Sequence, residues 1–124
     1  TGAPDAVMTD IMEKLNGFEK RQDFIKKGLT QQELAKSFNT NTTYLSQVIN
    51  ESKGKNFNAY LNELRIEYIT QKLYHNPKFL DYTLEGLSQK CGISSRKNFS
   101  DLFQEINGIR PTDFIKQRKK ELEE

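Results

Sequence analysis

Apolar residues recur at three- and four-residue steps along most of the chain, and strict alternation of apolar and polar residues is almost absent. This spacing places apolar side chains on one face of an α-helix, whereas alternation indicates strands. The pattern therefore predicts an all-α fold with about seven helices. We expect helices at residues 6–25, 31–38, 42–51, 57–75, 83–91 and 95–107, and a last one from Pro111 into the charged C-terminal end.

The predicted helices begin and end at residues that favour those positions. Thr30 and Glu33 have the spacing of a capping box, in which the threonine side chain accepts a hydrogen bond from an amide of the first turn. Gly28, Gly54 and Gly108 are each expected to end a helix, because glycine readily takes the left-handed conformation found there. The helix at 95–107 is expected to bury Phe99, Leu102, Phe103 and Ile106.

The two halves of the chain repeat one pattern of helices. Thr83 follows Thr30 by 53 residues, and after a one-residue slip in the turn Phe99 follows Leu45 by 54. Each half reads as a short helix, a tight turn, a second helix, a glycine and a third helix. A helix-turn-helix needs a small residue in its first helix and apolar residues that lock the second helix against it. These residues are Ala35, Leu45 and Val48 in the first copy, and Ser88, Phe99 and Leu102 in the second.

The repeat divides the chain into five expected segments. They are an N-terminal helix at 1–29, a first helix-turn-helix at 30–55, a linker helix at 56–76, a second helix-turn-helix at 77–110 and a C-terminal helix at 111–124. A helix over residues 57–75 would be about 28 Å long at 1.5 Å per residue. Because the chain opens on Thr1 and Gly2, we expect a sensor or dimerisation portion before it, connected through the first helix.

Composition narrows the classes of protein. With 124 residues, 35% hydrophobic and 29% charged, the chain can form one domain or two small lobes with buried cores. The 19 Lys and Arg residues outnumber the 17 Asp and Glu residues only slightly, so any basic surface must be local. No apolar run approaches the roughly 20 residues that span a bilayer. We expect no membrane contact by this part of the protein and a cytoplasmic location, even if the intact protein is anchored in a membrane.

No pattern of catalytic or metal-binding residues is visible. One cysteine, Cys91, and one histidine, His75, leave any conventional zinc site short of ligands. The chain has no Gly-rich phosphate loop and no nucleophile beside a usable base. We therefore expect no enzyme activity, no metal and no cofactor. Cys91 aligns with Phe38 in the repeat and is expected to be a buried thiol.

Several residues of the second half have the spacing of a known signature. They are Gly92-Ile93-Ser94, Phe99, Phe103, Gly108, Pro111 and Phe114. This arrangement resembles the signature of AraC/XylS-type transcriptional regulators. The first half is similar to the N-terminal helix-turn-helix and linker of that family in its residues Leu34-Ala35, Tyr44-Leu45-Ser46, Gly54-Lys55-Asn56-Phe57 and Tyr60-Leu61. The resemblance covers residues 30–116. The sequences at 41–46 and 62–65 are similar to those of sensor-linked members of the family in Bacteroidetes.

The resemblance implies a DNA-binding domain that regulates transcription. In this family, two helix-turn-helix lobes held by a long helix place their recognition helices in successive major grooves on one face of the duplex. The expected partner is therefore double-stranded DNA with a bipartite site about one helical turn apart. A sensor portion and RNA polymerase are the further partners that it implies, while activation or repression is left open.

The exposed faces of the two recognition helices supply candidate DNA contacts. Glutamine and asparagine can pair with adenine, hydroxyl groups can contact several bases, and arginine can bind guanine or a phosphate. The candidate base readers are Thr42, Thr43, Ser46, Gln47 and Asn50 in the first helix, and Arg96, Lys97, Asn98 and Ser100 in the second. Candidate phosphate contacts are Thr30, Lys53, Lys55 and Arg110.

Gln47 and Asp101 depart from the pattern of the family that the chain resembles, because both positions are often arginine in that family. A carboxylate that faces DNA is repelled by phosphates unless it accepts a hydrogen bond from a cytosine amino group or pairs with Arg96 or Lys97. Because of Asp101, we expect the second lobe either to hold mainly the DNA backbone or to read a narrow set of DNA sequences. The alternative function is a helical protein-interaction module that has the helix-turn-helix fold and does not read DNA by itself.

Overall fold

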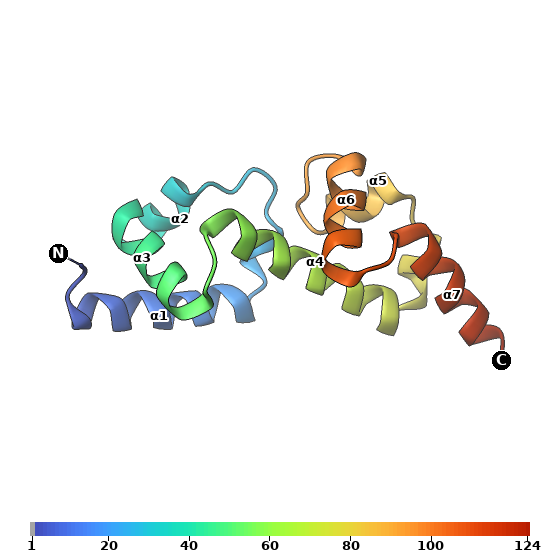
Figure 1. Ribbon diagram of the computed structural model, residues 1–124, viewed down its shortest axis with the longest axis horizontal. Coiled ribbons are helices and arrows are strands. Elements are labelled where there is room, and N and C mark those ends of the chain that lie inside the picture. The colour runs from blue at the N-terminus through green and yellow to red at the C-terminus, as the bar shows by residue number, and fades with distance from the viewer. Residues whose placement is uncertain (1) are drawn as a thin grey trace. The chain divides into compact units, whose positions relative to one another are not determined.

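The computed structural model describes residues 2–124, which form α-helices and two short 3-10 helices and no strand (Figure 1). The all-α prediction with about seven helices is confirmed. The α-helices are α1 (Asp5–Lys20), α2 (Gln31–Ser37), α3 (Thr42–Lys53), α4 (Phe57–His75), α5 (Leu84–Lys90), α6 (Arg96–Asn107) and α7 (Pro111–Glu123). The 3-10 helices are η1 (Asp23–Ile25) and η2 (Pro77–Asp81).

The chain divides into two compact units, one up to Leu61 and one from Asn62 onward. The boundary falls inside α4, so the first turns of this helix belong to one unit and the remaining turns to the other. Within residues 2–124, no helix has the length and apolar character needed to cross a membrane.

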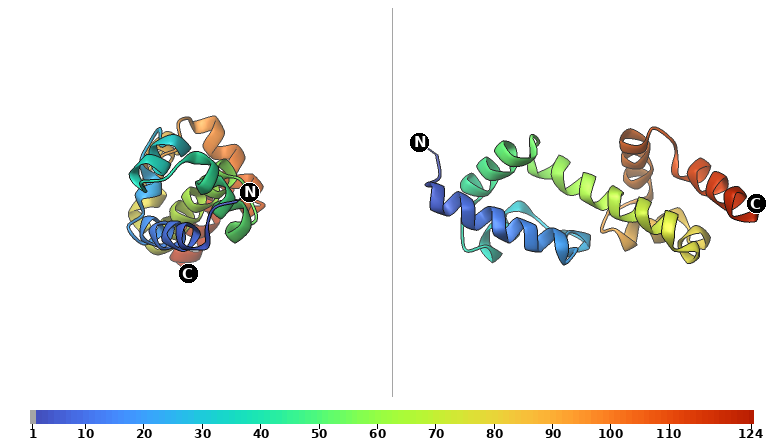
Figure 2. Two further views of the ribbon diagram at one scale, coloured as in Figure 1. Left: turned by 90° about the vertical axis from the view of Figure 1, so that its left-hand side faces the viewer. Right: turned by 90° about the horizontal axis from the view of Figure 1, so that it is seen from below.

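The first unit is built around buried faces of three helices. Helix α1 buries Ile11, Leu15 and Phe18, since these residues recur at three- and four-residue steps on one side. Helices α2 and α3 pack against each other, and α1 packs against α3 (Figure 2). Because α3 is held between these elements, its rotation about its own axis is determined by the core.

The second unit has an aromatic core around α6. Phe99 and Phe103 are fully buried on this helix, with ring centroids 5.8 Å apart. The Phe103 ring also lies 5.5 Å from that of Phe114 in α7. Cys91 is buried in the same cluster, as the sequence predicted, and burial raises the pKa of its thiol to about 11. The thiol is therefore protonated at neutral pH and is a packing residue.

Equivalent caps delimit the helices of the two units, which confirms the predicted repeat. Thr30 and Thr83 accept hydrogen bonds from the amides of Glu33 and Gly86, as N-cap residues of α2 and α5. Helices α3 and α6 are capped in the same way by Asn41 and Ser95 and end at left-handed glycines, Gly54 and Gly108. Both helices have 12 residues.

The turn explains the one-residue slip between the two copies. The amide of Thr40 donates to the carbonyl of Ala35 at 2.9 Å, and the amide of Ile93 donates equivalently to Ser88 at 2.9 Å. Ala35 and Ser88 are both buried, so each turn closes against a small side chain. The next helix is capped by Asn41 immediately after Thr40, whereas Ser94 intervenes before its counterpart in the second copy. Ser94 is thus the additional residue.

Three predictions about helix ends and faces are wrong. Gly28 has the expected left-handed conformation at φ 77°, but it lies in a turn and does not end an α-helix. The first helix ends at Lys20, before Ile25, because Gln22 takes a left-handed conformation at φ 60° and the chain continues as η1. Phe24 supplies the buried side chain there. Ile106 was expected in the core but is 37% exposed. Helix α6 ends at Asn107, one residue after Ile106, and the last turn of this helix is largely exposed to solvent.

Candidate nucleic-acid interface

Helix α3 carries the five predicted base readers of the first copy. Its apolar residues Leu45, Val48 and Ile49 are buried, so the remaining sides of the helix hold the polar residues. Thr43 and Asn50 are exposed, and Thr42, Ser46 and Gln47 are partly buried. The Asn50 side-chain amide donates to the Ser46 hydroxyl at 3.4 Å, one turn earlier. The structure therefore brings Ser46 and Asn50 together as one polar pair.

Gln47 is held by residues from the N-terminal segment, a connection that the sequence did not predict. Its Oε1 accepts a hydrogen bond from the amide of Ala3 at 2.8 Å, and Ala3 is buried. Its Nε2 lies 3.9 Å from the Met8 sulfur and 3.3 Å from the carboxylate of Glu51. Both polar ends of the amide are thus engaged, and reading a base requires these contacts to be exchanged.

Helix α6 carries the predicted base readers of the second copy. Arg96, Lys97 and Asn98 are exposed in its first turn, and Ser100 is partly buried. The backbone amide of Asn98 donates to the hydroxyl of the cap residue Ser95 at 3.1 Å. The charged residues of α6 thus begin directly after its cap.

Asp101 forms an ion pair with Lys97, which confirms one of the pairings expected for it. The Lys97 Nζ lies 3.0 Å from the Asp101 Oδ2, one helical turn apart. The lysine side chain is 87% exposed and the aspartate 64%. A pair this exposed contributes at most about 1 kcal/mol to folding stability. Its larger effect is electrostatic, because the lysine offsets the negative charge of the carboxylate.

Lys53, predicted to contact phosphate, is engaged inside the first unit. Its Nζ lies 3.2 Å from the Glu19 carboxylate and 5.8 Å from the centre of the Tyr60 ring. The Tyr60 hydroxyl donates a hydrogen bond to the same carboxylate, and burial, followed by this bond, raises the pKa of Tyr60 above its usual value. The lysine side chain is only 25% exposed. Lys53 therefore joins the ends of α1 and α3 through Glu19.

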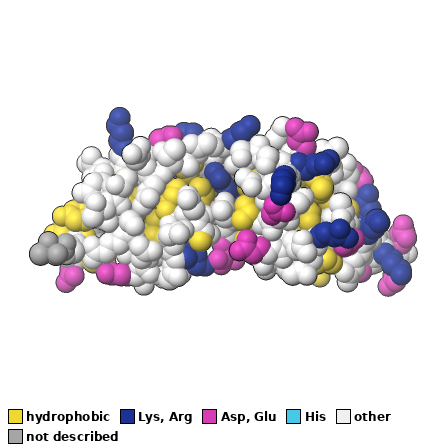
Figure 3. All heavy atoms as spheres, turned by 45° about the horizontal axis from the view of Figure 1, so that its top comes forward, with side chains coloured by type: hydrophobic (Ala, Val, Ile, Leu, Met, Phe, Trp, Pro, Cys, Tyr) yellow, Lys and Arg dark blue, Asp and Glu magenta, His cyan; other side chains and the backbone are white. Residues whose placement is uncertain are grey.

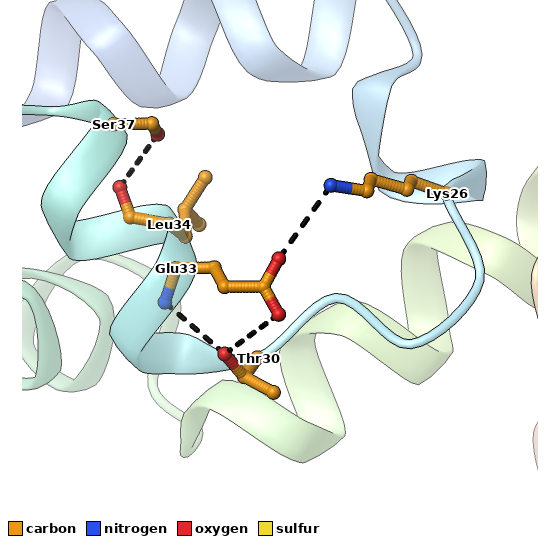
Figure 4. A network of polar contacts seen from close by, with 5 residues as sticks. All are labelled: Lys26, Thr30, Glu33, Leu34 and Ser37. Atoms are coloured by element: carbon orange, nitrogen blue, oxygen red, sulfur yellow. Dashed lines mark hydrogen bonds and ion pairs between the residues drawn. The ribbon is translucent and has the colours of Figure 1, made fainter.

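The hydroxyl of Thr30 is engaged by Glu33 (Figure 4). It accepts from the Glu33 amide at 3.1 Å and donates to the Glu33 carboxylate at 3.3 Å. The threonine half of the predicted capping box is therefore formed, while the glutamate side chain contacts the Thr30 hydroxyl. Lys26 Nζ lies 3.5 Å from the other carboxylate oxygen. A phosphate at Thr30 would therefore meet a carboxylate, which opposes its approach.

Arg110 and Lys55 are the other two predicted phosphate contacts. Arg110 is the residue before α7, and its Nε lies 3.3 Å from the Asp113 carboxylate. Its side chain is exposed and keeps further N–H groups beyond this pair. Lys55 lies in the short segment that connects α3 to α4, and its side chain is partly buried.

Charges of both signs are interspersed on the face drawn in Figure 3. Some of the lysine and arginine side chains there lie next to acidic side chains, and others stand apart from them. Two of the candidate DNA contacts, Lys97 and Arg110, are paired with carboxylates, those of Asp101 and Asp113. The positive charge that these two residues present to the solvent is therefore partly neutralised.

One family model and one curated protein each match most of the chain. The model is described as a helix-turn-helix domain and covers residues 34–117. The protein is the uncharacterized HTH-type transcriptional regulator YijO of Escherichia coli K12, which is 27% identical over 111 residues. That match covers 86% of this chain and 38% of the relative, so the chain spans less than half the length of the relative.

Solved structures show the same fold. The C-terminal domain of AraT, a response regulator from Geobacillus stearothermophilus, matches with a TM-score of 0.73 and 21% identity over 88% of this chain and 85% of that one. A transcriptional regulator from Chromobacterium violaceum, titled as an AraC-type DNA-binding domain-containing protein, matches with a TM-score of 0.70 and 19% identity, covering 91% and 92%.

Proposed function

The chain belongs to the AraC-type helix-turn-helix family of transcriptional regulators, and we propose that it reads double-stranded DNA sequence-specifically with α3 and α6. The observation that carries this proposal is the repeated construction of these two helices. Each has 12 residues, a polar N-cap, a buried apolar side and a left-handed glycine at its end. A helix presented in this way can lie in the major groove with its N-terminal residues against the base edges.

The polar residues of the two helices suit different bases. On α3 the Asn50 amide can pair with adenine, and the methyl group of Thr43 can contact a thymine methyl group. The hydroxyl groups of Thr43 and Ser46 can contact several bases. Arg96 on α6 is exposed in the first turn, where its guanidinium can take a guanine edge or a phosphate. We therefore propose that α3 reads an A·T-containing half-site and that α6 reads a half-site with G·C pairs.

A bipartite site is the expected consequence of two readers in one chain. Helix α4 is continuous over 19 residues, which corresponds to about 28 Å, and it joins the two units without an intervening loop. One turn of B-DNA is roughly 34 Å long, so two lobes on such a connector can reach successive major grooves. We propose that one chain occupies both half-sites without dimerising.

The selection of bound duplexes from a randomised pool by the purified chain at low salt tests the proposal. The expected result is enrichment of two short motifs whose centres are about 10 base pairs apart. Enrichment of one motif would contradict bipartite reading. No enrichment, together with no binding at low salt, would contradict DNA reading by this chain and favour the protein-interaction module.

Binding to unrelated DNA is expected to depend only moderately on salt. The net charge is +2, and two of the candidate phosphate contacts, Lys53 and Arg110, are paired with carboxylates. Each phosphate contact adds about 0.9 to the slope of log affinity against log salt concentration. Anisotropy titrations over a range of salt concentrations should therefore give a shallow slope. A slope as steep as about 10 would contradict this prediction.

The rest of the intact protein is proposed to carry the signal. The curated relative is longer than the matched region, and the similar structure of AraT is the C-terminal domain of a response regulator. We propose that a sensor or dimerisation portion connects to α1, that RNA polymerase is the downstream partner and that this domain works in the cytoplasm. The chain is proposed to regulate transcription by binding and to catalyse no reaction.

A further inference from the structure

We infer that Asp101 selects cytosine in the DNA half-site bound by α6, with Lys97 as the residue that positions and neutralises its carboxylate. This inference rests on the function proposed above, and it assigns one base of the DNA site to one residue of α6.

The repeat places Asp101 at a groove-facing position. The caps of α6, Ser95 and Gly108, follow Asn41 and Gly54 of α3 by 54 residues. Asp101 follows Gln47, a candidate base reader, by the same 54 residues. Lys97 likewise corresponds to Thr43.

The burial pattern of α6 agrees with this placement. Phe99 and Phe103 are fully buried on one side of the helix. Lys97 and Asp101 are four residues apart and exposed, so they share one face. In the DNA-bound chain that face is the one that α6 presents to base edges.

The ion pair removes the main obstacle to a carboxylate in the groove. An isolated carboxylate between two phosphate backbones is repelled. The Lys97 Nζ at 3.0 Å from Oδ2 makes the pair neutral as a whole. Oδ2 is held by the lysine, and Oδ1 has no hydrogen-bond or ion-pair partner among residues 2–124 and can face a base. An ion pair this exposed adds little to the stability of the helix, so stability alone does not explain why an acidic residue lies on this face.

A carboxylate favours one of the four bases in the major groove. An ionised aspartate can only accept hydrogen bonds, and cytosine offers its N4 amino group as a donor. Guanine offers two acceptors, O6 and N7, and thymine offers O4, so both repel the carboxylate. Adenine offers its N6 amino group beside the acceptor N7, which repels the second carboxylate oxygen. Cytosine is therefore the expected base.

The test is Asp101→Asn, because asparagine keeps the shape and adds a donor. Selection from a randomised pool by the wild type is expected to enrich cytosine at one position of the α6 half-site. The variant should enrich adenine there, since asparagine pairs with N6 and N7 together. Anisotropy on the two matched duplexes should show that the ratio of cytosine to adenine affinity falls about tenfold. The half-site bound by α3 should be unchanged.

The matched control is Glu123→Gln, which removes the same charge from the last turn of α7. It should strengthen binding to all duplexes slightly and change no base preference. If Asp101→Asn does only the same, Asp101 is a repulsive surface charge and the inference is wrong, while the proposed function stands. If the wild type enriches no motif, the proposed function fails, and the inference fails with it.

Discussion

Phe103→Ala is expected to destabilise the second unit by about 3 to 5 kcal/mol. The side chain is fully buried, and its ring contacts the rings of Phe99 in the same helix and Phe114 in α7. Removal of the ring leaves a cavity among aromatic side chains that cannot collapse without displacing α6 or α7. Because α6 is the proposed second recognition helix, loss of its packing should also abolish selective binding to the proposed second half-site.

Chemical denaturation and amide hydrogen exchange measure this effect. Amides of α5 and α6 should exchange much faster in the variant, whereas those of α2 and α3 should change less. Ile106→Ala is the matched control, because it removes an apolar side chain from the same helix at a position that is 37% exposed. Its cost should stay below about 1 kcal/mol. Equal losses in the two variants would show that Phe103 does not anchor the core.

The repeat could be predicted because it depends on local chemistry. Helix starts require a side chain that accepts from a free amide, and Thr30 and Thr83 supply it in both copies. Helices α3 and α6 end at a left-handed residue, which glycine adopts readily, and Gly54 and Gly108 supply it. These requirements involve residues within four positions of each other, so the sequence expresses them directly.

The end of α1 could not be predicted, because it depends on burial rather than on propensity. The periodicity of apolar residues allowed the helix to continue to Ile25. In the structure Phe24 is buried and packs its ring 6.2 Å from that of Phe18. That contact requires the backbone to turn at Gln22, which accepts an unusual left-handed conformation. Tertiary packing here overrides the local pattern.

The same distinction applies to the candidate interface. The residues that lie on α3 and α6 follow from helical spacing, and the pairing of Asp101 with Lys97 is local enough to be anticipated. The partners of Lys53 and Gln47 are Glu19 and Ala3, which lie far earlier in the chain. No spacing rule connects such residues, since only the packing of α1 against α3 brings them together.

Gln47→Ala is expected to weaken binding to the preferred site by about 1 to 3 kcal/mol, with little loss on random DNA. A glutamine amide reads adenine by accepting from N6 and donating to N7, so both of its ends are needed. In the unbound chain Oε1 accepts from the Ala3 amide at 2.8 Å, and Nε2 lies 3.3 Å from Glu51. The measured loss of binding free energy is therefore the free energy of the base contacts minus the free energy of the contacts that they replace.

Gln47→Glu separates base reading from the contact with the N-terminal segment. The glutamate retains an oxygen that can accept from the Ala3 amide, but it has no donor for adenine N7. We compare the ratio of affinities for preferred and random duplexes, because the added charge weakens both. If Gln47 reads adenine, this ratio falls in both variants. Gln47→Glu also loses the donor to Glu51 and sets two carboxylates beside each other, so a lower unfolding temperature is expected in both variants. A ratio that stays at the wild-type value in both variants would make Gln47 a structural contact between α3 and the N-terminal segment.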